Sequence, residues 1–267
     1  MPIYAPIWGC NLGDTLWVTP LTCYVPDLVV QMLGGDARSR ATAPILECLC
    51  PVEFVDRTTE TPKAPIRAHV TQQILTAYGH GGKPSIPCVI LKAAEVLWAV
   101  NYLKDLGYRP GDIAITNHNS GSGDPTNLRA HYVRPPTEVM NTLAKFWLRG
   151  GTHKVFQFGP SPMYHDRDPF EALPGTVVVR GLSVRELAAC YHVIGRLISG
   201  DTGDYHLMLA VGGKAACLVP PHSDQMGYRY WDLHYDSICW GGERPGVRYA
   251  LHNDWATFMD TTLFTLL

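Results

Sequence analysis

The chain has 267 residues, a formal net charge of −2 at pH 7, 46% hydrophobic residues and only 17% charged ones. This length allows a sizeable buried core, and the near-neutral charge excludes the basic stripe that strong nucleic-acid binding requires. No apolar run reaches the roughly 18 residues of a membrane span, so we expect no membrane partner. Average chains carry roughly 25% charged residues. The shortage of charge indicates either an exterior covered by neighbouring subunits or a compact enzyme with a large interior.

The eight cysteines are scattered along the chain, and no secretory signal precedes them. We therefore expect reduced, buried thiols in an intracellular protein. Cys48 and Cys50 have the spacing of half a zinc site, but a second close pair of ligands is missing. Two cysteines on a buried strand is the simpler interpretation.

The sequence pattern of the first 60 residues is typical of strands and turns. Short apolar runs are interrupted by prolines, and Pro-rich strands favour sheet edges. The predicted strands are 3–8, 16–18, 21–30 and 52–55. A polar connector follows, and Pro65 suits the first turn of a helix that ends before Gly79.

The central part of the chain alternates helices and strands. Residues 91–107 predict a helix, because its apolar residues recur at three- and four-residue spacing. Its expected inward stripe is Ala93, Val96, Leu97, Val100, Leu103 and Gly107. A second helix begins at about 135 and buries Met140, Leu143, Ala144 and Trp147. Strands are predicted at 113–116, 155–158 and 176–179.

A capping box marks the next helix, because Ser183 and Glu186 can satisfy each other's backbone amides. The predicted helix ends at Gly200 and buries Leu187, Cys190, Tyr191, Ile194 and Leu197. Runs 205–211 and 215–219 flank Gly212-Gly213, which predicts a hairpin.

These elements favour an α+β fold with a mixed, largely antiparallel sheet packed with about four helices, because the first fifty residues offer no crossover helices. We expect a single domain over 1–267, with a strand-rich layer at 1–60 and a helix-strand body at 61–267 as the alternative division.

One group of residues has the composition of an iron site. His222 and Asp224 lie two apart, so a strand would point both the same way, and His252 follows downstream. Two imidazoles and a carboxylate bind iron(II) in non-haem oxygenases. A hydrolase built around His118 or Ser161 is a weaker alternative. No cysteine nucleophile follows the next predicted strand, 155–158, to partner His118, and Ser161 lies between prolines without the glycine-flanked elbow of a serine nucleophile.

Aromatic residues gather near the C-terminus among glycines and charged residues. Large amphipathic rings are enriched at protein–protein contacts. The candidate interface residues are Tyr228, Tyr230, Trp231, Tyr235, Trp240 and Trp255.

Two stretches, LKAAEVLWAVNYLKDLGY with DIAIT and VMNTLAKFWLRGGTHKVFQF, resemble the helix-strand pattern of shell proteins from totivirus-like double-stranded RNA viruses. The resemblance implies a capsid protein that packs in many copies into an icosahedral shell, located in the virion or the host cytoplasm. The chain is much shorter than members of that family, and no active residue is carried over.

The sequence therefore predicts a structural, self-assembling protein, more readily than an enzyme, with no catalytic residues and no cofactor. Its expected partners are copies of itself or other shell proteins, with weak nonspecific contact to RNA. The alternative function is a non-haem iron(II)-dependent oxygenase that uses His222, Asp224 and His252.

Overall fold

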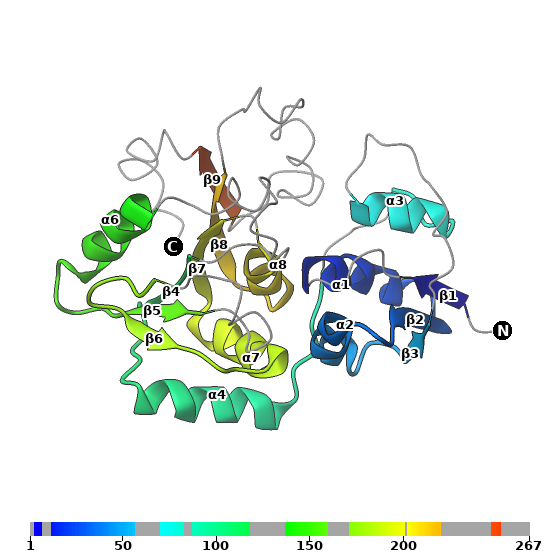
Figure 1. Ribbon diagram of the computed structural model, residues 1–267, viewed down its shortest axis with the longest axis horizontal. Helices are drawn as coiled ribbons and strands as arrows, with labels where there is room; N and C mark the ends of the chain where they lie inside the picture. The colour runs from blue at the N-terminus through cyan, green and yellow to red at the C-terminus, as the bar shows by residue number, and fades with distance from the viewer. Residues whose placement is uncertain are drawn as a thin grey trace.

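The computed structural model describes residues 3–6, 12–56, 70–82, 87–117, 137–159, 171–200, 202–219 and 247–251. The described strands form two sheets, one of three strands and one of six, and every pairing between neighbouring strands is parallel. Helices lie between most of the strands that follow one another in the sequence, which suits parallel connections. The two sheets lie side by side in Figure 1, with helices between them.

The first part of the chain, residues 3–82, builds the small sheet unit, with strand order β1-β2-β3. Its strands alternate with short helices, and its core contains Leu28, Val30 and Met32 from the central strand. Its elements are β1 (Ile3–Pro6), α1 (Leu12–Val18), the 3-10 helix η1 (Thr19–Cys23), β2 (Leu28–Leu33), α2 (Ala37–Thr42), the 3-10 helix η2 (Ala43–Leu46), β3 (Val52–Val55) and α3 (Val70–Ala77).

The rest of the described chain builds the large sheet unit, with strand order β6-β5-β4-β7-β8-β9. The chain adds strands outward from β4 in one direction, then returns to β7 and adds strands in the other direction, as in doubly wound folds. Its elements are α4 (Ala93–Asp105), β4 (Ile113–Thr116), α6 (Thr137–Leu148), β5 (Val155–Phe158), β6 (Val177–Val179), α7 (Val184–Ile194), β7 (Arg196–Gly200), α8 (Gly203–Ala210), β8 (Lys214–Val219) and β9 (Val247–Leu251).

The large sheet is covered on both faces. On one face, Ile113, Ile115 and Ile198 pack against α6. On the other face, Ala114 and Leu197 pack against α4, α7 and α8. Residues of β4 are buried on both sides, which explains why this strand reads as one continuous apolar run.

The prediction of a largely antiparallel sheet is wrong. Crossover helices are present in the first fifty residues: α1 and η1 connect β1 to β2, and α2 and η2 connect β2 to β3. Residues 16–18, predicted as a strand, belong to α1. The described residues also contain more α-helices than the four expected. Short apolar helices next to prolines resemble strands in sequence, and this caused the error.

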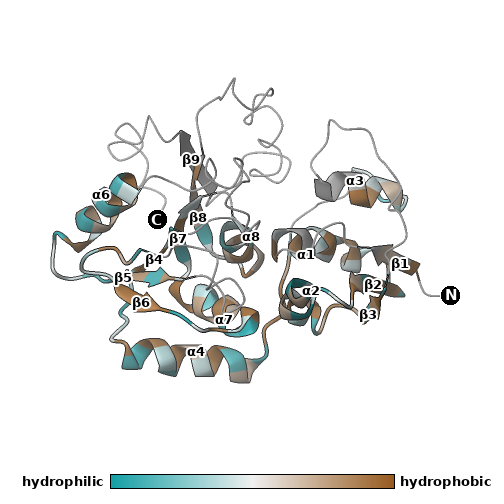
Figure 2. Ribbon diagram, viewed as in Figure 1, coloured by the Kyte–Doolittle hydropathy of each residue, from teal (hydrophilic) through white to brown (hydrophobic). Residues whose placement is uncertain are grey.

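Helix α4 confirms the predicted helix but not its predicted inward face. Leu97 is 62% exposed and Val100 is 41% exposed, whereas Ala99 and Leu103 are fully buried. Figure 2 shows polar and apolar residues alternating around this helix. The face of α4 that packs against the core is therefore rotated from the predicted stripe. Leu103 is the only residue of that stripe that is fully buried.

The hairpin predicted around Gly212-Gly213 is wrong. Residues 203–210 form α8, and β7 and β8 are parallel neighbours on either side of this crossover. The predicted helix after Ser183 is confirmed in its start, but it ends at Ile194. Gly195 takes a left-handed conformation with φ 71°, and the next residues form β7. The predicted strands 113–116 and 155–158 are confirmed.

Candidate functional site

The direction of chain winding in the large sheet reverses between β4 and β7. In open parallel sheets, ligands bind beyond the carboxyl ends of the strands at such a reversal, because the connections leave in opposite directions and open a crevice. Here β4 ends at Thr116 and β7 ends at Gly200. The side chains at this edge are therefore the first place to look for a binding site.

Three hydroxyl groups form a buried chain at this edge. The Thr116 hydroxyl donates to Ser199 Oγ over 2.7 Å, and Ser199 Oγ lies 3.0 Å from Thr202 Oγ1. All three side chains are buried. Either hydroxyl can donate in the Ser199–Thr202 bond, so the Thr202 hydroxyl can serve a ligand as donor or as acceptor.

Asn117 follows directly after β4 and is fully buried. Its amide nitrogen lies 3.5 Å from Thr137 Oγ1, at the start of α6. Its carbonyl oxygen Oδ1 is buried and has no hydrogen-bond partner. An unpaired buried carbonyl costs about 1–3 kcal/mol, so a donor supplied by a ligand would recover that energy. Asn117 is therefore a candidate ligand-binding side chain at this edge.

The first turn of α8 lies at the same edge. Thr202 precedes the helix at the N-cap position, but its side chain makes no capping hydrogen bond. Its hydroxyl is held by Ser199 instead. The amide groups in the first turn of a helix favour negative charge, and a helix that directly follows a strand presents them at the sheet edge. The start of α8 therefore has backbone amides that favour an anion, whereas the Asp204 carboxylate in the same turn opposes one.

Asp204 adds a negative charge in this first turn, and the structure holds that charge below the surface. One carboxylate oxygen accepts a hydrogen bond of 2.7 Å from the Tyr191 hydroxyl, and both residues are buried. Burial, together with the Asp204 carboxylate, raises the pKa of Tyr191 well above its ordinary value, so the phenol remains a donor. This bond keeps the carboxylate on the core side of α8.

The small sheet unit touches α8 close to this site. Leu12 of α1 lies so near Gly203 that a Cβ atom at Gly203 would come within 2.8 Å of Leu12 Cβ. The Trp17 ring meets the His206 ring edge to face, with centroids 6.1 Å apart. The carboxyl edge of the large sheet is therefore bordered by α1 of the small unit.

The iron-site residues His222, Asp224 and His252 lie outside the described residues. The same is true of His118 and Ser161, and of the interface candidates Tyr228, Tyr230, Trp231, Tyr235, Trp240 and Trp255. Their predicted roles are therefore not tested by the geometry.

Cys48 and Cys50 are described, and they lie in a turn after η2, not on a buried strand, with Cys48 exposed at φ 70°. Within the described ranges, no three histidine, cysteine or acidic side chains are grouped to hold a metal ion. Nor does any helix in the described part of the chain have the length and apolar character to cross a membrane.

Comparison with known proteins gives matches at the level of structure only. No family model matches the sequence, and no curated protein matches it. A glycosyl transferase family 9 structure from Veillonella parvula DSM 2008 superposes with a TM-score of 0.51 at 18% identity, covering 92% of this chain and 68% of that one. Escherichia coli ADP-heptose LPS heptosyltransferase II gives 0.51 at 14% identity, covering 94% and 90%. The fold is a GT-B-like glycosyltransferase fold.

A third glycosyltransferase supports the same fold. The dodecameric, iron-containing heptosyltransferase TibC, in complex with ADP-D-beta-D-heptose, superposes with a TM-score of 0.52 at 13% identity. That match covers 86% of this chain and 61% of TibC. The glycosyltransferase fold is thus found in several proteins with little sequence similarity to this one.

The capsid and virion predictions are wrong, because the chain has a glycosyltransferase fold with parallel sheets. The iron-oxygenase alternative is contradicted as well, because the solved structures that share this fold are named as glycosyltransferases. Alternation of helices and strands is common to many folds, and so the resemblance to shell proteins carried no specific information.

The predicted site residues did not include Thr116, Asn117, Ser199 and Thr202. A signal for them was present: an apolar strand ends in Ser199-Gly200, and Thr202-Gly203 follows before another apolar run. Strand, glycine-containing turn and helix in this order are typical of anion-binding junctions. The signal was lost because 205–211 was predicted to be a strand.

Proposed function

We propose that the protein is a glycosyltransferase that transfers a sugar from a nucleoside-diphosphate donor to an acceptor. The observation that carries the proposal is the prepared polar edge between β4 and β7, with Asn117 Oδ1 buried and unpaired. The fold supports it, because the structures that superpose with TM-scores above 0.5 are named as glycosyltransferases, two of them with ADP-heptose in the name.

The charge of the donor fits the β7–α8 junction. A diphosphate group brings negative charge, which a helix start and the Thr202 hydroxyl favour. Asn117 Oδ1 accepts hydrogen bonds only, so its partner must be a hydroxyl or amine hydrogen of the donor, not a phosphate oxygen. A nucleotide sugar carries both kinds of group, whereas inorganic phosphate at neutral pH supplies mainly acceptors.

The reaction needs stabilisation of the departing group. The bond between the sugar anomeric carbon and the diphosphate oxygen breaks, and a bond from an acceptor oxygen to that carbon forms as the acceptor loses a proton. Negative charge grows on the departing diphosphate. In this proposal the start of α8 stabilises that charge, and fixed donors are worth most where charge develops in the transition state. The described residues thus bind and orient the donor.

The proposal is tested by calorimetric titration of the protein with ADP, GDP and UDP. We expect one of the three to bind. Replacing Asn117 by Ala removes an acceptor, and Thr202→Val removes a donor. Each variant should weaken binding by roughly 10- to 100-fold, as expected for lost hydrogen bonds worth about 1.5–3 kcal/mol.

A matched control is Asn101→Ala, which removes an exposed asparagine from α4. This variant should bind the nucleotide as the unaltered protein does. Thermal unfolding of all three variants separates lost binding from lost folding. Failure of all three nucleotides to bind would contradict the proposal. So would folded Asn117→Ala and Thr202→Val variants that bind the nucleotide as tightly as the unaltered protein does.

A further inference from the structure

Two cysteine side chains that are far apart in the sequence are in contact in the structure. Cys23 is the last residue of η1, and Cys88 lies in segment 87–92, which leads from the small sheet unit to α4. The Cys88 thiol and the Cys23 side chain form a hydrogen bond. Thiols in contact can be joined by small rotations of their side chains, whereas distant thiols require movement of the backbone. The pair is therefore placed to form a disulfide.

The backbone of Cys88 is fixed beside η1. Its amide donates to Thr19 Oγ1 over 3.0 Å, about one turn of η1 before Cys23. The next amide, of Val89, donates over 3.1 Å to the Ala210 carbonyl at the end of α8. These hydrogen bonds hold Cys88 next to Cys23 before any covalent bond forms.

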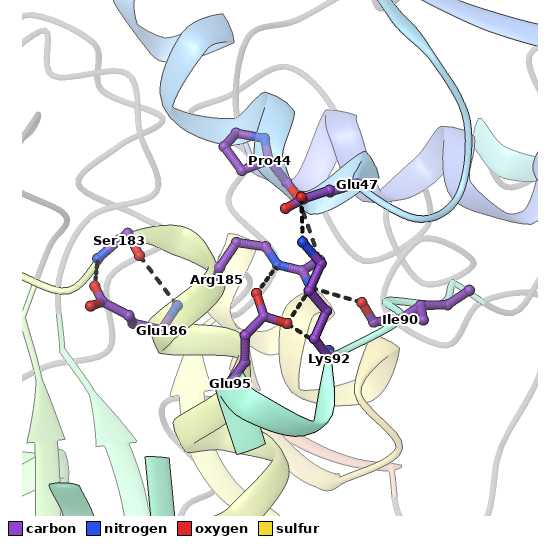
Figure 3. A network of polar contacts seen from close by, with 8 residues as sticks. All are labelled: Pro44, Glu47, Ile90, Lys92, Glu95, Ser183, Arg185 and Glu186. Atoms are coloured by element: carbon purple, nitrogen blue, oxygen red, sulfur yellow. Dashed lines mark hydrogen bonds and ion pairs between the residues drawn. The ribbon is translucent and has the colours of Figure 1, made fainter. Parts of the chain in front are cut away.

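The residues that follow Cys88 are fixed to the large sheet unit (Figure 3). The Arg185 guanidinium donates to the Ile90 carbonyl over 2.8 Å and, through Nε, to Glu95 Oε1 over 2.8 Å. Arg185 is buried, and its hydrogen bonds hold the pKa of Glu95 below the ordinary value. Charge-assisted hydrogen bonds of this kind are strong. The segment is thus held at Cys88 and beyond it, so a disulfide there demands little rearrangement of the backbone.

The two thiols differ in their access to solvent. Cys23 is exposed, and Cys88 is half-buried. Burial, together with the neighbouring Cys23, raises the pKa of Cys88 to about 11, against a smaller opposing effect of hydrogen bonds from Thr19 and Thr22. Because the thiolate is the form that attacks a disulfide, Cys88 is protected as well as protonated at neutral pH. The exposed Cys23 is therefore the thiol that meets an oxidant first.

A second cysteine near Cys88 is placed less well for this reaction. Cys50 is half-buried and packs against the core of the small sheet unit. Burial, and then the charge of Cys88, raises the pKa of Cys50 to about 11, and the Val30 amide donates a hydrogen bond to its sulfur. Cys23, which is both exposed and in contact with Cys88, is the better partner.

We propose that Cys23 and Cys88 are a dithiol site that is oxidised reversibly to a disulfide by small disulfide compounds such as oxidised glutathione. The Cys23 thiolate attacks one sulfur of oxidised glutathione, which gives a mixed disulfide and releases one reduced glutathione. The Cys88 thiolate then attacks the Cys23 sulfur of the mixed disulfide and releases the second. The protein gives up two protons and two electrons, which the two glutathione molecules carry away. The new bond fastens segment 87–92 to η1.

The first test is to map the bond in the full chain. Reduced, folded protein is treated with excess oxidised glutathione at about pH 8, where thiolates form, and the remaining thiols are alkylated. Digestion with trypsin and Asp-N separates Cys23 from Cys10, because Asp14 lies between them. We expect mass spectrometry to find peptides linked through Cys23 and Cys88, which dithiothreitol separates again. Glutathione retained on Cys23 without this linkage, or linkage of Cys88 to Cys50 instead, would overturn the proposal.

Thermal unfolding is the second readout. A cross-link restricts the unfolded chain, and the effect grows with the length of the loop that it closes, here from residue 23 to residue 88. Oxidation should therefore raise Tm by about 5–10 °C in the unaltered protein. Cys23→Ser and Cys88→Ser should show no such rise. Cys48→Ser removes another exposed thiol and is the matched control, which should respond as the unaltered protein does.

Two further outcomes would overturn the proposal. If the linked peptides form only in urea, or form without a rise in Tm, the two thiols are not neighbours in the native protein. Because Cys23 is exposed, Cys23→Ser keeps the test decisive even where Cys88→Ser fails to fold. Neither readout involves a nucleotide, so failure of the proposed function leaves this test unaffected.

Discussion

Two buried amide side chains at the large sheet differ in how their hydrogen-bonding groups are satisfied. Gln157 of β5 is fully paired: its oxygen accepts from the Leu173 amide over 2.7 Å and from Thr176 Oγ1 over 3.1 Å, and its nitrogen donates to the Glu171 carbonyl. It holds the loop before β6. Asn117 is equally buried, yet its oxygen has no partner. The sequence places both residues at strands, but only the three-dimensional structure tells which amide is satisfied.

Buried thiols give a prediction at the residue scale. Burial, with a smaller contribution from Glu186, raises the pKa of Cys190 to about 12, from 9.0. The unfolded chain therefore releases this proton at lower pH than the folded protein does. The contribution of this thiol to the free energy of unfolding is complete below pH 9. It is lost as the pH rises towards 12, by at most about 1.4 kcal/mol per pH unit.

Urea unfolding between about pH 8 and pH 10.5 checks this prediction. The unaltered protein should lose stability above pH 9 more steeply than Cys190→Ala does. Cys48→Ala removes an exposed thiol and serves as the control, with the slope of the unaltered protein. Identical slopes for Cys190→Ala and the unaltered protein would contradict the burial of this thiol.

Helix α8 shows why the candidate site could not be predicted from sequence. It lies between the large sheet and α1, so Tyr205, Leu207, Met208 and Ala210 are all buried. A helix buried on several sides loses the period of an amphipathic helix and reads as a short strand. Leu197 falls at the apolar spacing of α7, so the sequence pattern did not reveal that the helix ends before Gly195. By contrast, the amphipathic α6 and the Ser183–Glu186 capping box were predicted correctly, because their signals are local.

The contact between α1 and α8 leads to a prediction at the element scale. A methyl group at Gly203 would lie 2.8 Å from Leu12 Cβ, which is bound to the backbone and cannot rotate away. Gly203→Ala should therefore destabilise the protein by about 1–3 kcal/mol, the usual cost of overpacking. Chemical denaturation of the purified variant measures this change.

Gly13→Ala on the partner helix is the control. Its added Cβ would meet His206 Cδ2 at 3.6 Å, which is an ordinary contact. Because Ala favours a helix over Gly by up to about 1 kcal/mol, this variant should be as stable as the unaltered protein or slightly more stable. Equal stabilities of the two variants would show that α1 and α8 are not in tight contact.

At the scale of the whole molecule, the pairing of the strands could not be predicted from the sequence. Strands 113–116 and 155–158 were predicted from their composition, but the reversal between β4 and β7 depends on contacts more than 80 residues apart, such as the Thr116–Ser199 hydrogen bond. The predicted antiparallel sheet and the viral resemblance were both wrong, because both were inferred from short-range sequence patterns. Division of the chain near residue 60 and self-association stay predictions; size-exclusion chromatography measures the second.

The proposed function depends most on a ligand site at the carboxyl edge between β4 and β7. Hydrogen–deuterium exchange measured by mass spectrometry, with and without a saturating nucleoside diphosphate, tests it most directly. We predict slower exchange in peptides that contain 113–117 and 199–206, and unchanged exchange in 52–56 of the small sheet. Protection confined to other described segments, or none anywhere despite measured binding, would contradict the account.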